Sequence, residues 1–187
     1  MSDVDAVLQE CERKMARAVE ILKQDYLNIR TGRATPALLD KIQVDAWGAT
    51  QPVNALATIS VPEPRLLVIQ PWDKTTISAI EKAIQKSDLG ITPNSDGTVI
   101  RLALPQLTEQ RRGELGKQVR KRGEEQKVAV RNCRRDADGE LKKLEKDGKI
   151  SQDDARRATE RVQKITDGWI KQIDESADKK EREVKEV

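Results

Sequence analysis

Apolar residues recur at steps of three and four along the first thirty residues of the chain. These residues are Leu8, Cys11, Met15, Ala18, Leu22, Tyr26 and Ile29. Four of them are spaced by sevens, so the pattern predicts a helix with one apolar seam. Ser2 and Asp5 resemble a capping box at its start, because the hydroxyl can accept a bond from a free backbone amide and the carboxylate is favoured at the positive helix end.

The hydrophobic period changes to two between residues 36 and 105, a stretch that contains all seven prolines. Alternating or short continuous apolar runs predict strands over residues 42–47, 57–61, 66–69 and 98–102. Isoleucines at steps of three and four predict one short helix over residues 77–84, which Leu89 and Gly90 close. Residues 31–105 are therefore predicted to form a small β-rich α/β domain.

The helical pattern resumes after Thr108, a predicted N-cap. The seam of this second long helix consists of Leu115, Val119, Gln126, Val130, Cys133, Ala137, Leu141 and Leu144. Gly148 supplies a stop, and Ser151 with Asp154 repeats the capping pattern before a third long helix. The seam of the third helix consists of Ala155, Ala158, Val162, Ile165, Trp169, Ile173 and Ala177.

Three helices with the same kind of seam predict a bundle, because a lone helix with such a stripe must bury it against partners. The bundle is discontinuous, since residues 1–30 supply one helix and residues 106–187 the other two. The predicted fold class is thus α+β, an elongated three-helix bundle with the β-rich domain inserted. Gly113, Gly116 and Gly123 each cost about 1 kcal/mol relative to Ala in a helix interior, so the first half of the second long helix is predicted to be weak.

The composition argues against an enzyme. The chain has no His, its two Cys are far apart in sequence, and neither of the common phosphate-binding glycine motifs occurs. No metal site, cofactor or catalytic residue is therefore predicted, and Cys11 and Cys133 are expected to be small buried hydrophobes. No apolar run approaches the 18 or so residues of a membrane span, and the N-terminus is acidic. We expect a cytoplasmic protein with no membrane partner.

The net charge of +3 is unevenly distributed, since residues 106–149 alone carry +5. On a helical wheel at 100° per residue, six cations fall beside the apolar seam, between about +40° and +140° from Val130. These residues, the basic stripe, are Lys117, Arg120, Lys127, Arg131, Arg134 and Arg135. Glu124 and Asp138 are the only acids inside the stripe, so repulsion among its cations is expected to be largely uncompensated without an anionic partner.

The basic stripe is predicted to bind a polyanion. Most charged helix faces are simply solvated, but arginine forks match phosphate geometry, so a nucleic-acid backbone is the natural partner. Charge alone does not distinguish among RNA, DNA and an acidic protein surface. The lack of aromatic residues in this stretch disfavours stacking on single-stranded bases.

Five segments of the chain resemble bacterial ribosome recycling factors. They read NIRTGRATP at 28–36, IEKAI at 80–84, SDLGITPN at 87–94, LPQLTEQRR at 104–112 and VAVRNCRRDA at 128–137. The resemblance covers nearly the whole chain in the same domain order. It implies an L-shaped pair of domains that splits post-termination ribosomes together with elongation factor G, the partner that hydrolyses GTP. Cys133 and the glycines from Gly113 to Gly123 depart from a typical member.

The resemblance also implies roles for individual cations. Arg131, Arg134 and Arg135 would contact rRNA of the large subunit, with the rest of the basic stripe beside them. Arg30 and Arg33 would belong to a basic surface near the hinge, although a cation at a helix C-terminus is favourable to the helix dipole in any case. The expected partners are the ribosome and elongation factor G, and the chain itself is expected to be a monomer. The alternative function is a helical scaffold or adaptor whose stripe binds an acidic protein.

Two chain crossings, near residues 30–33 and 103–106, are predicted to join the domains and to act as a hinge. The hinge residues are Thr31, Gly32, Leu104 and Pro105. Gly32 is the expected pivot, because glycine tolerates backbone angles that other residues do not.

Overall fold

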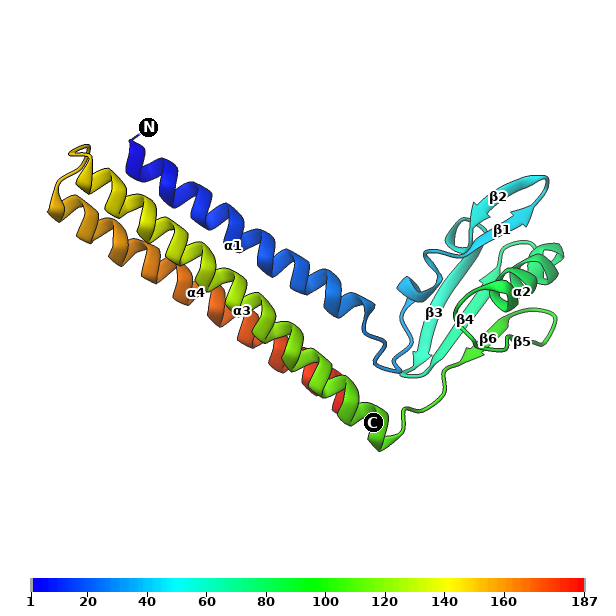
Figure 1. The fold of residues 1–187 in the computed structure, drawn as a ribbon. Coiled ribbons are helices and arrows are strands. Elements are labelled where there is room, and N and C mark those ends of the chain that lie inside the picture. The colour runs from blue at the N-terminus through cyan, green and yellow to red at the C-terminus, as the bar shows by residue number, and fades with distance from the viewer. Residues whose placement is uncertain (1, 187) are drawn as a thin grey trace. The chain divides into compact units, whose positions relative to one another are not determined.

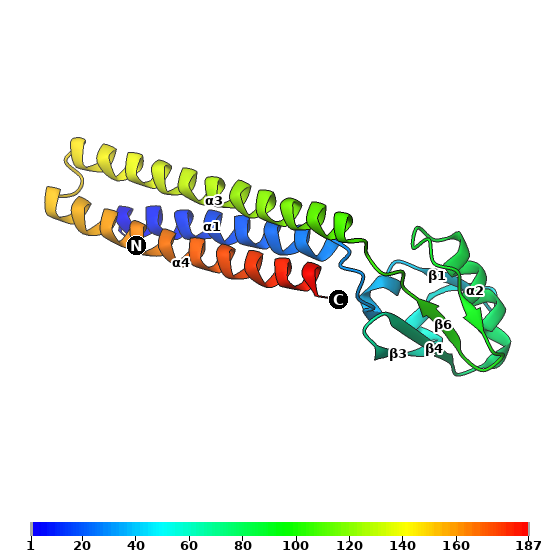
Figure 2. The same cartoon turned by 90° about the horizontal axis from the view of Figure 1, so that it is seen from below.

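The computed structural model describes residues 2–186, which fold into two compact units (Figure 1). Helices α1 (Asp3–Asn28), α3 (Glu109–Lys146) and α4 (Gln152–Lys185) form the first unit. They lie side by side, and a short turn joins α3 to α4 (Figures 1 and 2). Residues Thr31–Leu107 form the second unit, inserted between α1 and α3. The structure therefore confirms the predicted α+β fold with a discontinuous three-helix bundle.

Each helix of the bundle begins at the predicted cap. The Ser2 hydroxyl accepts a hydrogen bond from the Asp5 backbone amide at 3.2 Å, and the Asp5 carboxylate accepts one from the Ser2 amide at 3.3 Å. The Thr108 hydroxyl accepts from the Arg111 amide at 3.1 Å, and the Ser151 hydroxyl accepts from the Asp154 amide at 3.0 Å. Because the first amides of a helix lack partners within the helix, these bonds fix where the helices start.

Aliphatic side chains fill the seam between the three helices. Met15, Leu22, Val130, Val162 and Ile173 have no exposed surface. The predicted seam of α3 is confirmed at its five aliphatic positions up to residue 141, which are buried, while its other members are half-buried. The half-buried members are Gln126, Cys133 and Leu144. The core is narrow and aliphatic, as expected for a chain with no Phe.

The two cysteines meet where α1 packs on α3. The buried Cys11 thiol donates to the Cys133 carbonyl oxygen at 3.8 Å, and both thiols are free. Burial raises the pKa of the Cys11 thiol to about 11, so this side chain stays neutral. The prediction of a small buried hydrophobe is confirmed for Cys11, whereas Cys133 is half-buried.

Helix α3 runs unbroken through its glycines. A Cβ at Gly123 would lie 3.2 Å from the hydroxyl oxygen of Tyr26 on α1, a buried group that donates to the Val119 carbonyl oxygen at 2.8 Å. Gly123 thus allows α1 to approach α3 closely, a packing role in addition to its cost in helix propensity. A Cβ at Gly113 or Gly116 would meet no atom within 4 Å in the described chain.

The inserted unit contains two antiparallel sheets and one helix. Strands β1 (Gln43–Ala46) and β2 (Ala49–Pro52) form a hairpin, and α2 (Ile77–Lys86) packs on β1. The second sheet has the order β3-β4-β6-β5, with β3 (Ala57–Glu63), β4 (Leu66–Pro71), β6 (Ile100–Ala103) and β5 (Asn94–Ser95). The short helical turns are η1 (Pro36–Leu39), η2 (Val53–Ala55) and η3 (Lys74–Thr76).

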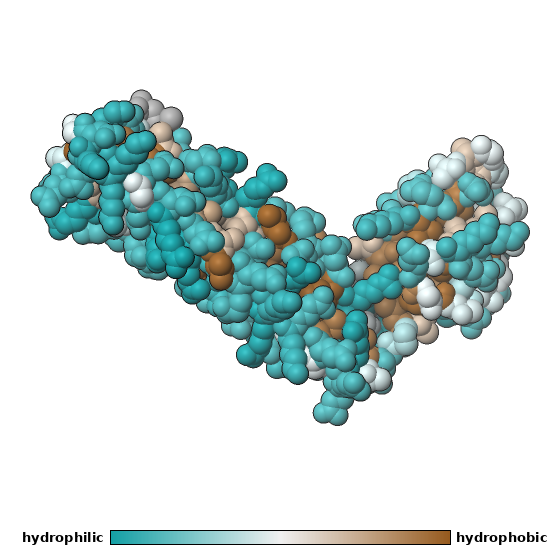
Figure 3. All heavy atoms as spheres, in the orientation of Figure 1, coloured by the Kyte–Doolittle hydropathy of each residue, from teal (hydrophilic) through white to brown (hydrophobic). Residues whose placement is uncertain are grey.

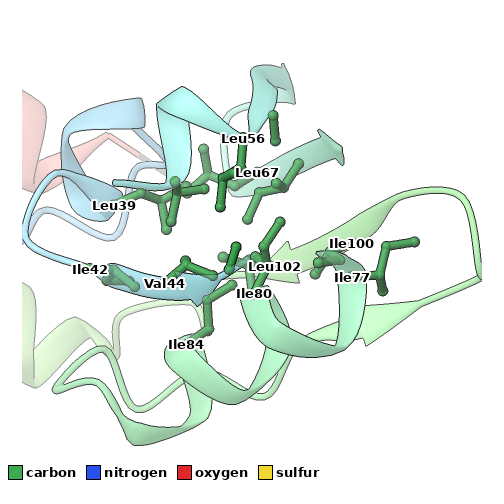
Figure 4. Packing of buried hydrophobic residues seen from close by; sticks show 14 of the residues in the cluster. Leu39, Ile42, Val44, Leu56, Leu67, Ile77, Ile80, Ile84, Ile100 and Leu102 are labelled. Carbon is green, nitrogen blue, oxygen red and sulfur yellow. The ribbon is translucent and has the colours of Figure 1, made fainter. Parts of the chain in front are cut away.

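One aliphatic core unites these elements (Figure 4). Leu39 of η1, Val44 of β1, Leu67 of β4, Ile80 of α2 and Ile100 of β6 are all at most 2% exposed. The four predicted strands and the short helix are confirmed. Strands β2 and β5 were not predicted, because β2 reads ATQP without a large apolar side chain and β5 has only two residues.

Both connections to the bundle are anchored at one turn of the inserted unit. The Ala34 amide donates to the Pro64 carbonyl oxygen, and the Leu104 amide donates to that of Arg65, each at 2.8 Å. Leu104 therefore continues the pairing of β6 with the chain just before β4 and does not lie in a free segment. Gly32 has φ of +77°, a left-handed conformation that favours glycine, and a Cβ there would lie 3.1 Å from Leu107 Cγ.

In the part of the chain that the structure describes, no helix is long and apolar enough to span a membrane. No three Cys, Asp or Glu side chains of residues 2–186 gather as a potential metal site.

Candidate nucleic-acid interface

The basic stripe occupies one flank of α3, beside the apolar seam that packs on the other helices. Lys117, Arg120 and Arg135 are exposed, whereas Arg131 and Arg134 are half-buried. Lys127 is also half-buried, with 16% of its side chain exposed. Figure 3 shows that the face of the bundle seen there is dominated by hydrophilic residues, with scattered apolar patches between them.

Three cations of the stripe, spaced by sevens, reach across to α4. We call Arg120, Lys127 and Arg134 the inner row. Arg120 forms a two-pronged ion pair with Glu181, its Nε and Nη2 atoms each 3.0 Å from a carboxylate oxygen. Lys127 Nζ lies 2.7 Å from Asp174 Oδ1 and also 2.7 Å from Glu124 Oε1 on its own helix. These contacts tie α3 to α4 outside the apolar seam.

The third contact of the inner row is indirect. Arg134 Nη1 donates to Gln163 Oε1 at 3.5 Å, and Gln163 Nε2 donates to Asp167 Oδ1 at 2.8 Å. Asp167, Asp174 and Glu181 are themselves spaced by sevens, so α4 offers an acidic row that runs antiparallel to the inner row. Because the Arg134 contact is long and made to a neutral amide, the guanidinium keeps its charge uncompensated.

The remaining cations, Lys117, Arg131 and Arg135, form the outer row. No carboxylate of residues 2–186 lies within ion-pairing distance of their side chains. The two acids of the stripe do not neutralise them: Glu124 pairs with Lys127, and the Oδ1 atom of Asp138 is buried without a hydrogen-bond partner among the described residues. The outer row and Arg134 therefore present four positive charges that the protein itself leaves available.

The pKa shifts follow the same division. The hydrogen bonds from Arg120 and Lys185 lower the pKa of the Glu181 carboxyl, and the Asp174 and Glu124 carboxylates raise the pKa of the Lys127 ammonium group. Both shifts favour the charged forms of Glu181 and Lys127. The expectation of uncompensated repulsion was wrong for Arg120 and Lys127, because their partners come from a helix more than 45 residues further along the chain.

That pairing could have been found in the sequence. In two antiparallel neighbouring helices, the residue numbers of facing positions add up to a constant. Opposite charges that repeat every seven residues on both helices therefore indicate ion pairs between the two helices. A helical wheel of α3 alone carries no information about the acids of α4.

The two cations of the first crossing lie beyond the end of α1. The helix ends at Asn28 with Ile29 as its C-cap, and its last turn contains no basic residue. Arg30 and Arg33 are both exposed. Arg30 directly follows the C-cap, so the helix dipole can still favour its charge, whereas Arg33 lies three residues further along the chain. They lie in the same connection as Thr31 and Gly32, while Leu104 and Pro105 lie in the return connection.

Comparison with known proteins identifies a consistent set of relatives. A sequence model of the family described as ribosome recycling factor matches residues 22–184. The chain is 59% identical over 181 residues to the ribosome-recycling factor of Halalkalibacterium halodurans, covering 97% of this chain and 98% of the relative. It is 55% identical over 184 residues to that of Heliobacterium modesticaldum, covering 98% and 100% of the two chains.

Solved structures give the same result. One, a solution structure of the ribosome recycling factor, matches with a TM-score of 0.77 and 42% identity over the whole of both chains. Another presents the Thermus thermophilus ribosome recycling factor and the Escherichia coli elongation factor G bound to the Escherichia coli post-termination complex. Its recycling factor has a TM-score of 0.64 and 43% identity, covering 98% of this chain and 99% of that one.

Proposed function

The chain belongs to the ribosome recycling factor family, and we propose that it recycles ribosomes by binding the post-termination complex and, with elongation factor G and GTP, promoting its separation into subunits. The observation that carries this proposal is the end-to-end match to a recycling factor solved with elongation factor G on a post-termination complex. In this role the chain is a non-enzymatic cytoplasmic factor that acts as a monomer, and GTP is hydrolysed by its partner.

We infer that the bundle docks on large-subunit rRNA through Arg131, Arg134 and Arg135, with Lys117 beside them. Three features support this choice: these cations share one flank of a rigid helix, they have no carboxylate partner in residues 2–186, and arginine forks fit phosphate oxygens. Arg120 and Lys127 act mainly by holding α3 against α4, which fixes the position of the outer row.

The two crossings are proposed to be the hinge between the units. Thr31, Gly32 and Pro105 lie outside the bonds that anchor Ala34 and Leu104 to the sheet, so changes in backbone angle would be concentrated there. Arg30 and Arg33 then place positive charge at the moving joint, where they would contact the same RNA surface as the bundle.

The decisive experiment is a ribosome-splitting assay. Post-termination complexes are mixed with this protein, elongation factor G and GTP, and subunit separation is followed by light scattering. Splitting that requires all three components is expected. If splitting does not depend on this protein, but the protein still co-sediments with an acidic protein partner, the alternative of a helical scaffold is correct instead.

A further inference from the structure

The inserted unit carries a groove that the recycling role does not explain. It has a volume of about 560 Å³ and lies between α2 and the start of β1. Three lysines line it: Lys82 and Lys86 from α2, and Lys41 from the turn before β1. The groove is therefore built by segments about forty residues apart in the sequence.

The backbone brings these side chains to one side by simple periodicity. Ser78, Lys82 and Lys86 are four residues apart, so they form one stripe along α2. In β1 the buried residues Val44 and Ala46 alternate with exposed residues, which places Gln43 and Asp45 on the groove side.

The lysines of the groove have no acidic partner. No carboxylate of residues 2–186 pairs with Lys41, Lys82 or Lys86, and all three are exposed. The only acid in the lining, Asp45, accepts a hydrogen bond from Thr50 at 2.9 Å. Two lysines four residues apart on one helix repel each other, so an anion between them would be stabilised.

The other lining groups suit a phosphate backbone better than a protein. The Ser78 hydroxyl has no hydrogen-bond partner in the described chain, and hydroxyls and ammonium groups are common ligands of phosphate oxygens. Apart from the buried Ile42, the apolar lining consists only of Ala79 and Ala83. A protein interface would need larger apolar or aromatic anchors at its centre.

We propose that this groove is a second RNA-binding site, in which Lys41, Lys82, Lys86 and Ser78 hold the sugar-phosphate backbone of ribosomal RNA. The identity of the RNA as ribosomal rests on the proposed function. The contacts proposed are to the sugar-phosphate backbone, so the site is expected to bind RNA without regard to sequence. It gives the inserted unit its own attachment to the ribosome, separate from the basic stripe of the bundle.

The test compares two charge-matched variants of the full chain. The groove variant carries Lys41→Gln, Lys82→Gln and Lys86→Gln. The control variant replaces three exposed lysines of the bundle that also lack ion-pair partners, namely Lys142, Lys149 and Lys164. Affinity is measured at several salt concentrations for 70S ribosomes and for a short RNA duplex.

The groove variant should bind both probes at least tenfold more weakly than the control, with the slope of log affinity against log salt reduced by about 3. If the groove and control variants bind both probes alike, the proposal is overturned. The two proposals can fail separately. If the wild-type protein does not split ribosomes but the groove variant loses affinity for the duplex, the proposed function is rejected and the RNA-binding site is still supported.

A crosslinking experiment tests whether the groove contacts RNA or protein, and it leaves the three lysines of the groove unchanged. A benzophenone-bearing amino acid is placed at position 78, and the full chain is irradiated on 70S ribosomes. Adducts recovered on ribosomal RNA support the proposal. Adducts found only on protein, or no adducts at all, overturn it even if the groove variant folds poorly.

Discussion

Replacing Arg131, Arg134 and Arg135 together by Ala should separate RNA binding from folding. None of the three has a carboxylate partner in residues 2–186, and each lies outside the buried seam of α3. Each substitution should therefore change the free energy of unfolding by only about 0.5 kcal/mol, as at an ordinary surface position. The thermal unfolding curve should barely move.

The effect on binding follows from the charges removed. Each phosphate contact contributes a slope of about −0.9 to log affinity against log salt, a value measured for duplex DNA. Losing three contacts should flatten that slope by roughly 2 to 3. Between 50 and 200 mM salt, the wild type should then lose roughly 40-fold more affinity than the variant. Lys replacements should restore only part of the affinity, because a point charge cannot reproduce the planar fork.

The assay is ribosome co-sedimentation at several salt concentrations, with a melting curve for each protein. The triple variant is compared with a double variant, Arg120→Ala with Lys127→Ala, which removes the cations that form ion pairs with α4. This variant should melt at a lower temperature and keep most of the salt slope. The reasoning is refuted if a folded triple-Ala protein binds with unchanged affinity and slope, because these three arginines would then form only a solvated face.

Four further outcomes are expected. Gly113→Ala should raise the free energy of unfolding by up to about 1 kcal/mol in a denaturant titration. Gly123→Ala should raise it less, or lower it, because the added Cβ would press against the Tyr26 hydroxyl. Equal gains in the two variants would contradict the packing role of Gly123. Burial raises the pKa of Tyr26, the chain's single tyrosine, to about 12, so this side chain should lower the stability between about pH 10 and 12. The Cys11 thiol, whose pKa burial raises from about 9 to about 11, should already lower the stability from about pH 9. Tyrosinate absorbance with a midpoint near 10 in the folded protein would disprove the burial argument for Tyr26. Gly32→Ala should destabilise the inserted unit by about 1 kcal/mol because of the positive φ of Gly32. An unchanged denaturant unfolding curve would show that the backbone of this connection can change its φ without cost. Replacing residues 34–105 by a short flexible linker should leave a cooperative helical melt by circular dichroism, and its absence would mean that the bundle needs the inserted unit to fold.

Periodic signals in the sequence were sufficient for much of the fold. The caps at Ser2, Thr108 and Ser151 and the seams of all three long helices depend on neighbours within one turn, so they can be read locally. Strand β2 could not be predicted, because its place in the structure comes from pairing with β1 and not from any apolar side chain of its own.

The sequence predicted which cations share one flank of α3, but not which of them form ion pairs with another helix. The wheel placed Arg120 and Arg131 in one stripe, since both follow from the period of a single helix. Their difference depends on Glu181, which lies 61 residues from Arg120 and is brought to it only by the packing of α4. The role of Gly123 likewise depends on Tyr26 in another helix. The lysine groove was missed because Lys41 and Lys82 meet through tertiary structure alone.

The anchoring of both connections at adjacent residues, Pro64 and Arg65, has a consequence for the order of assembly. During synthesis α1 emerges first, and its apolar stripe has no partner until α3 and α4 have been made. An unfolded insert would be a long loop, whose closure costs entropy that grows with its length. Once the insert has folded, Ala34 and Leu104 are held at neighbouring carbonyls, and that loop is reduced to a few residues on either side. Folding of the insert therefore shortens the loop between the end of α1 and the start of α3, and so lowers the entropy cost of closing the split bundle.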